Sequence, residues 1–72
     1  MTVGEAQQIC NAIFDGNSFE ALSETEYRAL MAISNAIDGN PLSQNMPYKD
    51  ALFIQSCAAK ASSLEAQKGN EN

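Results

Sequence analysis

The sequence predicts a small all-α domain, a bundle of three helices over residues 3–15, 23–38 and 47–68. Apolar residues recur at three- and four-residue steps in three separate segments, which is the spacing of one face of an α-helix. No segment alternates apolar and polar residues over more than a few positions, as a half-buried strand would. A chain of 72 residues has room for one domain, which we place over 1–72.

The first helix is predicted to begin after Thr2. Thr2 and Glu5 form a capping-box pattern, in which both side chains accept hydrogen bonds from backbone N–H groups that the helix start leaves unpaired. Asp15-Gly16-Asn17 is expected to end the helix, because glycine takes the left-handed conformation that closes a helix at no steric cost. A single helical turn is expected at 18–22. The predicted inner stripe of the first helix consists of Val3, Ala6, Ile9, Cys10, Ile13 and Phe14.

The second helix has the clearest start. Ser23 and Glu26 form another capping box, and Leu22 is placed to pack on Tyr27 as a hydrophobic staple. The segment Asp38-Gly39-Asn40 followed by Pro41 ends this helix, since proline cannot continue it. The predicted inner stripe consists of Tyr27, Leu30, Ile33 and Ile37.

The third helix is predicted to follow a loop over residues 42–46. Pro47 suits a first helical turn, where its missing N–H is no loss, and Asp50 complements the positive end of the helix dipole. The helix is expected to run to Lys68, and residues 69–72 are expected to fray. Its predicted inner stripe consists of Ala51, Ile54, Cys57, Ala58, Ala61 and Leu64.

The charge balance disfavours several classes of partner. Nine acidic residues against four basic ones give a net charge of −5, which keeps a small domain soluble. The four cations are scattered along the sequence, so they assemble no patch for phosphates, and the acidic excess disfavours nucleic acid and anionic lipid. The longest apolar runs are too short to span a membrane, and the first residues lack a basic region followed by an apolar stretch. We therefore expect a cytoplasmic protein.

The residue types of common catalytic and metal sites are sparse. The chain has no histidine, the commonest general base and zinc ligand. Cys10 and Cys57 both fall on apolar stripes, which favours buried packing residues in a reducing compartment, while a disulfide between the first and third helices and a thiol-dependent function remain alternatives. Asp15 and Asp38 lack the regular oxygen pattern of a calcium loop. We expect no enzyme activity, no metal and no cofactor.

Apolar side chains beyond the inner stripes point to a protein partner. A three-helix domain has limited area to cover them, and leftover apolar surface marks interfaces. We predict a protein–protein interaction module, a small regulator or inhibitor that binds another protein or itself as a homodimer. A helix-turn-helix DNA-binding domain is the alternative, suggested by the capped helix pair that begins at Ser23. The predicted partner-binding residues are Met31, Met46, Tyr48, Leu52 and Phe53.

Overall fold

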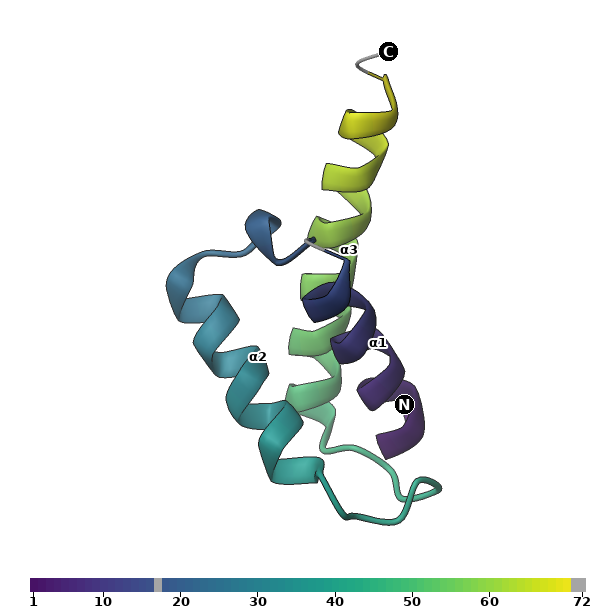
Figure 1. Ribbon diagram of the computed structural model, residues 1–72. Coiled ribbons are helices and arrows are strands. Elements are labelled where there is room, and N and C mark those ends of the chain that lie inside the picture. The colour runs from purple at the N-terminus through teal and green to yellow at the C-terminus, as the bar shows by residue number, and fades with distance from the viewer. Residues whose placement is uncertain (17, 71–72) are drawn as a thin grey trace.

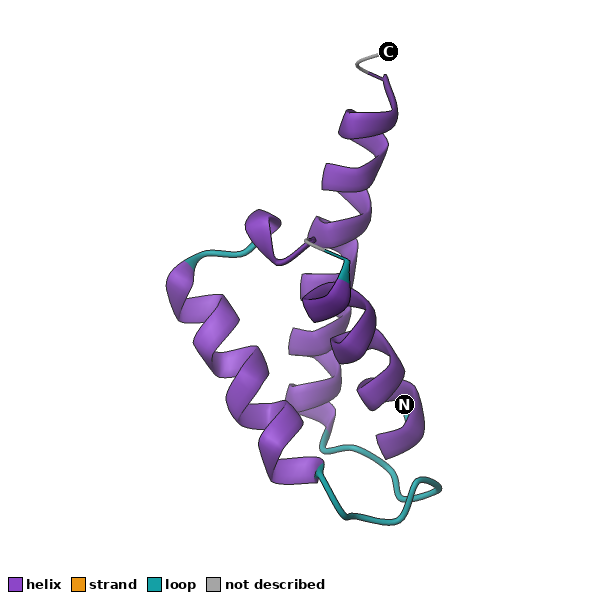
Figure 2. Cartoon of the chain, viewed as in Figure 1, coloured by secondary structure: helices purple, strands orange, loops and turns teal. Residues whose placement is uncertain are grey.

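Three α-helices and one short 3-10 helix form the fold. The computed structural model describes the backbone of residues 1–16 and 18–70, and the side chains of 1–16 and 19–64. The elements are α1 (Val3–Asp15), η1 (Ser18–Ala21), α2 (Glu24–Ile37) and α3 (Tyr48–Asn70), with α1 and α2 packed against the first half of α3 (Figure 1). Figure 2 shows no strand in the described ranges, and their β-structure is limited to one isolated bridge between Thr2 and Asn45. The predicted all-α three-helix bundle is confirmed.

The predicted starts of α1 and α2 are confirmed by their capping boxes. Glu5 N–H donates to the Thr2 hydroxyl at 3.3 Å, and Thr2 N–H donates to the Glu5 carboxylate at 3.1 Å. The same reciprocal pair joins Ser23 and Glu26, at 3.1 Å and 2.9 Å. Each box satisfies N–H groups that have no partner inside a helix.

The two Asp-Gly-Asn segments end their helices differently. Gly39 has φ +86°, the left-handed conformation expected of a closing glycine after the C-cap residue Asp38. Gly16 has φ −96° and ψ 9°, so the same expectation is wrong for the first helix. Gly16 N–H still donates to the Ala12 carbonyl at 3.1 Å, which is the i to i−4 bond of the last helical turn. The third residue of the first segment, Asn17, lies outside the described residues.

The core is a single apolar cluster to which all three helices contribute. Ile54 and Cys57 of α3 meet Leu30 of α2 and Cys10 of α1, and all four are fully buried. The predicted inner stripes supply nearly all of it, because residues three and four apart in sequence share one face of a helix. The buried cluster consists of Val3, Ala6, Cys10, Ile13, Leu30, Ile37, Met46, Ile54, Cys57 and Ala61.

The connection over residues 38–47 is tied to the start of α1. Val3 N–H donates to the Gln44 carbonyl at 2.8 Å, and Gly4 N–H donates to the Leu42 carbonyl at 3.0 Å. Met46 N–H donates to the Met1 carbonyl at 2.9 Å, which carries the Met46 side chain into the core. The first two bonds pair first-turn N–H groups of α1 that a helix itself cannot satisfy.

The third helix is longer than its neighbours, and its C-terminal part projects beyond α1 and α2 (Figure 1). It extends two residues past the predicted end at 68, and the remaining residues of the predicted frayed tail, 71 and 72, lie outside the described ranges. None of the described helices has the combination of length and hydrophobicity that crossing a bilayer requires.

Candidate functional site

The structure separates the five residues predicted to bind a partner. Tyr48 is 77% exposed, Leu52 47% and Met31 39%, whereas Phe53 is half-buried against the core. Met46 is only 8% exposed and belongs to the core cluster, because the 38–47 connection folds over the N-terminus. The Met46 side chain is therefore buried and largely inaccessible to a partner.

Tyr48 and Leu52 are the two that share a face. They lie four residues apart on α3, so their side chains are neighbours on one side of the helix. Leu52 precedes the fully buried Ile54 by two residues, which places the two ~200° apart around the helix axis. The pair Tyr48 and Leu52, called here the outer face of α3, consequently points away from the core.

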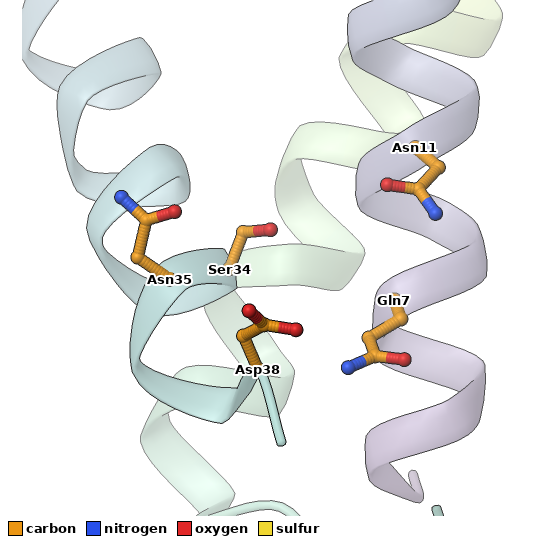
Figure 3. Close-up of a pocket in the computed structure, with 5 residues that line it drawn as sticks. All are labelled: Gln7, Asn11, Ser34, Asn35 and Asp38. Carbon is orange, nitrogen blue, oxygen red and sulfur yellow. The ribbon is translucent and has the colours of Figure 1, made fainter. Parts of the chain in front are cut away.

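A polar hollow lies between α1 and α2. It has a volume of about 190 Å³ and is lined by Gln7 and Asn11 of α1 and by Ser34, Asn35 and Asp38 of α2. The Gln7 and Asn11 amides project from α1 toward Ser34 and Asp38 on the facing helix (Figure 3). Gln7 and Asn11 are four residues apart on α1, and Ser34 and Asp38 are four residues apart on α2, so each pair lies on one side of its helix.

The side chains around the hollow are not engaged with one another. Among the described residues, no side-chain hydrogen bond and no ion pair joins any two of the five. Asp38 is the only charged side chain in the lining. The hollow thus presents open hydrogen-bonding groups and one carboxylate to solvent.

Sequence reasoning did not find the hollow. Gln7 and Asn11 lie off the apolar stripe of α1, a position that ordinarily means solvent. The sequence does contain a second group of polar residues on the next helix, which consists of Ser34, Asn35 and Asp38. Two such polar groups indicate a site only when the packing of the helices places them opposite each other. Met31 lies on the same side of α2 as this row, because it is three and four residues before Ser34 and Asn35.

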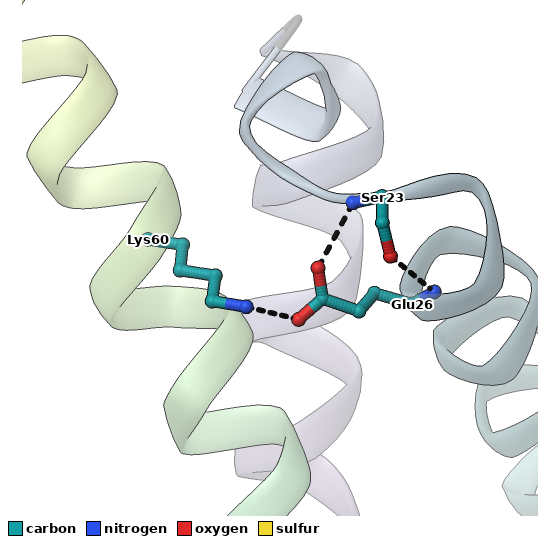
Figure 4. A network of polar contacts seen from close by, with 3 residues as sticks. All are labelled: Ser23, Glu26 and Lys60. Atoms are coloured by element: carbon teal, nitrogen blue, oxygen red, sulfur yellow. Dashed lines mark hydrogen bonds and ion pairs between the residues drawn. The ribbon is translucent and has the colours of Figure 1, made fainter.

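A polar contact joins α2 to α3 on another side of the bundle. The Glu26 carboxylate accepts from Ser23 N–H and also pairs with the Lys60 ammonium, so one side chain caps α2 and binds α3 (Figure 4). Lys60 and then the Ser23 backbone N–H hold the pKa of Glu26 at about 2, well below its usual 4.5. Both partners keep solvent contact, with Glu26 23% and Lys60 46% exposed, so water screens the attraction between them.

The two cysteines are free and fully buried. Burial raises the pKa of both thiols, and the neighbouring Cys57 raises that of Cys10 further. At Cys57 the Glu26 carboxylate adds to the rise, while Lys60 opposes it. A thiol with a raised pKa is protonated at neutral pH and is a poor nucleophile. Two free, fully buried thiols fit the packing interpretation, and the raised pKa of each disfavours a reactive thiol.

The structure also bears on a metal site and on a helix-turn-helix. Among the described residues, no group of three or more acidic or cysteine side chains is placed to hold a metal ion. The α2–α3 connection covers residues 38–47, much longer than the three- or four-residue turn of a helix-turn-helix.

Comparison with protein-family models, with curated proteins and with solved structures finds no match to this chain.

Proposed function

We propose that this chain is a non-enzymatic protein-binding domain that self-associates through the outer face of α3. The exposure of two large apolar side chains one turn apart, Tyr48 at 77% and Leu52 at 47%, is the observation that supports this proposal. Tyrosine suits such a role because its ring buries a large area at small entropic cost and its hydroxyl stays hydrated. Two copies related by a twofold axis would place this face against itself.

The size of the face sets the strength of the association. A specific, stable dimer buries about 800 Å² per partner, which is roughly one sixth of the 4717 Å² surface of the chain. One aromatic side chain contributes about 150–250 Å², so Tyr48 and Leu52 supply only part of that area. The proposed dimer is accordingly weak and reversible, which suits a small regulator or inhibitor whose face is free to exchange its own copy for another protein.

Sedimentation velocity over a wide concentration range tests this proposal. The wild-type chain is expected to shift from monomer toward dimer as concentration rises, and the double variant Tyr48→Gln with Leu52→Gln is expected to remain monomeric. Glutamine keeps helix propensity while removing the apolar contact. Met31→Gln serves as the matched control, because it removes an exposed apolar side chain from a different helix and should leave the dimer intact. A wild-type chain that stays monomeric throughout, or a control that abolishes association equally, would overturn the proposal.

We also propose a reducing compartment, the cytoplasm, as the location of the protein. Two free cysteines that share one core cluster support it, since oxidising compartments favour disulfides. Measuring the thiol content of the protein isolated from its source under alkylating conditions tests this proposal. Two reduced thiols per chain are expected, and a disulfide-linked chain would contradict it.

A further inference from the structure

We propose that the hollow between α1 and α2 binds a guanidinium group, the side-chain head of an arginine presented by a partner peptide. The hollow has a volume of about 190 Å³ and is lined by Gln7, Asn11, Ser34, Asn35 and Asp38. Gln7 and Asn11 reach across it from α1 toward Ser34 and Asp38 (Figure 3). This site is distinct from the outer face of α3, so it does not depend on self-association.

The lining matches the hydrogen-bonding pattern of a guanidinium. That group carries five N–H donors in a plane and no acceptor. Asp38 supplies two carboxylate oxygens for a bidentate pair, and the Asn11 amide oxygen faces the gap from the opposite helix to accept a further donor (Figure 3). A half-turn of the Gln7 amide about its last bond would bring its oxygen to the gap, where its nitrogen now lies. A lysine ammonium offers three donors about a point charge and would use fewer of these acceptors.

Asp38 is the charged element of the site, and helix stability does not explain its presence. It is the C-cap residue of α2, where the helix dipole disfavours a carboxylate. The described cations that form ion pairs do so elsewhere, since Arg28 pairs with Glu24 and Lys60 with Glu26. A carboxylate that is unfavourable where it stands and has no cation paired to it in the described part of the chain is suited to an external cation.

The bulk charge of the domain adds to this preference. The chain has a net charge of −5, which attracts a basic segment and repels an acidic one. Met31, which is 39% exposed, lies on the same side of α2 and gives the aliphatic part of an arginine an apolar surface.

An NMR titration of the full chain with N-acetyl-arginine-amide tests the inference. We expect binding in the millimolar range, with shifts concentrated in the side-chain amide signals of Gln7, Asn11 and Asn35. N-acetyl-citrulline-amide has nearly the same shape without the charge, and N-acetyl-lysine-amide has the charge without the planar group. Citrulline should bind about tenfold more weakly or not at all, because hydrogen bonds to a charged group are stronger than those to a neutral one. Lysine should also bind about tenfold more weakly, because its ammonium has three donors in place of five and cannot form the planar bidentate pair. Equal binding of citrulline would show a neutral polar site and overturn the inference, as would the absence of shifts at the hollow.

A pair of matched variants separates the site from general charge attraction. Asp38→Asn should weaken arginine binding about tenfold or more, whereas Glu24→Gln removes the same charge from the opposite end of α2 and should leave binding unchanged. Circular dichroism should show that both variants keep the fold. Retained arginine binding in Asp38→Asn, or an equal loss in both variants, would overturn the inference.

Discussion

Replacing Ile54 with alanine should destabilise the protein far more than replacing Leu52, although the two lie only two residues apart on α3. Ile54 is fully buried, and removing such a side chain to alanine costs about 2–5 kcal/mol. A 72-residue domain has a total stability of roughly 4–11 kcal/mol, at 0.05–0.15 kcal/mol per residue, so this loss is a large share of it. Leu52 is 47% exposed, so its truncation forfeits about half of a leucine burial, roughly 1 kcal/mol.

Urea unfolding followed by far-UV circular dichroism, at concentrations low enough to keep the chain monomeric, measures this difference. For a domain of this size 1 kcal/mol corresponds to about 4–8 °C in Tm, so thermal unfolding gives an independent check. If Ile54→Ala does not fold, Ile54→Val should still lose about 0.5–1.5 kcal/mol. A larger loss at Leu52 than at Ile54 would refute the orientation of α3 in the bundle, because the two side chains lie on opposite faces.

Three further changes have expected outcomes. Gly39→Ala should lower the free energy of unfolding by about 1 kcal/mol, because φ +86° strains any residue with a Cβ even though the space there is open; an unchanged urea midpoint would contradict this. Glu26→Gln should be less stable than wild type above pH 4.5, and the difference should vanish as pH falls toward 2. The reason is that the folded pKa of Glu26 lies below its unfolded value, so the stabilisation is lost when the carboxylate is protonated. If urea unfolding curves gave the same stability difference at every pH, the role of the Lys60 pair would be refuted. Cys10 and Cys57 should react slowly with a thiol reagent in the native protein and rapidly in urea, and fast native modification would contradict their burial.

The helices could be predicted from the sequence because their signals are local. Thr2 with Glu5 and Ser23 with Glu26 each form a cap within four residues, and the structure contains both boxes. The inner stripes depend only on helical periodicity, so Leu30 and Ile54 could be assigned to the core before any tertiary contact was known. Helix caps and helical periodicity depend only on residues that are close in sequence, so they can be recognised without the tertiary structure.

Features that depend on contacts between distant segments could not be predicted in this way. The sequence around Met46 predicts an exposed loop residue. In the structure Met46 N–H donates to the Met1 carbonyl, and the loop packs over the core. The outer face of α3 was partly predicted, because Tyr48 and Leu52 lie off the inner stripe, but the sequence also grouped them with Phe53, which packs against the core. No local sequence pattern predicts the polar hollow, because Gln7 and Asp38 line the same space only when α1 and α2 lie side by side.

Amide chemical shifts of the full chain, recorded during dilution, test the proposed function most directly. Signals around Tyr48 and Leu52 should move with concentration and return to fixed values at high dilution, while those of the buried Ile54 and Cys57 should stay constant. Such a pattern would show that the exposed side of α3 meets another copy while the core remains intact. Concentration-independent spectra, or shifts confined to a different helix, would contradict a binding face at this position.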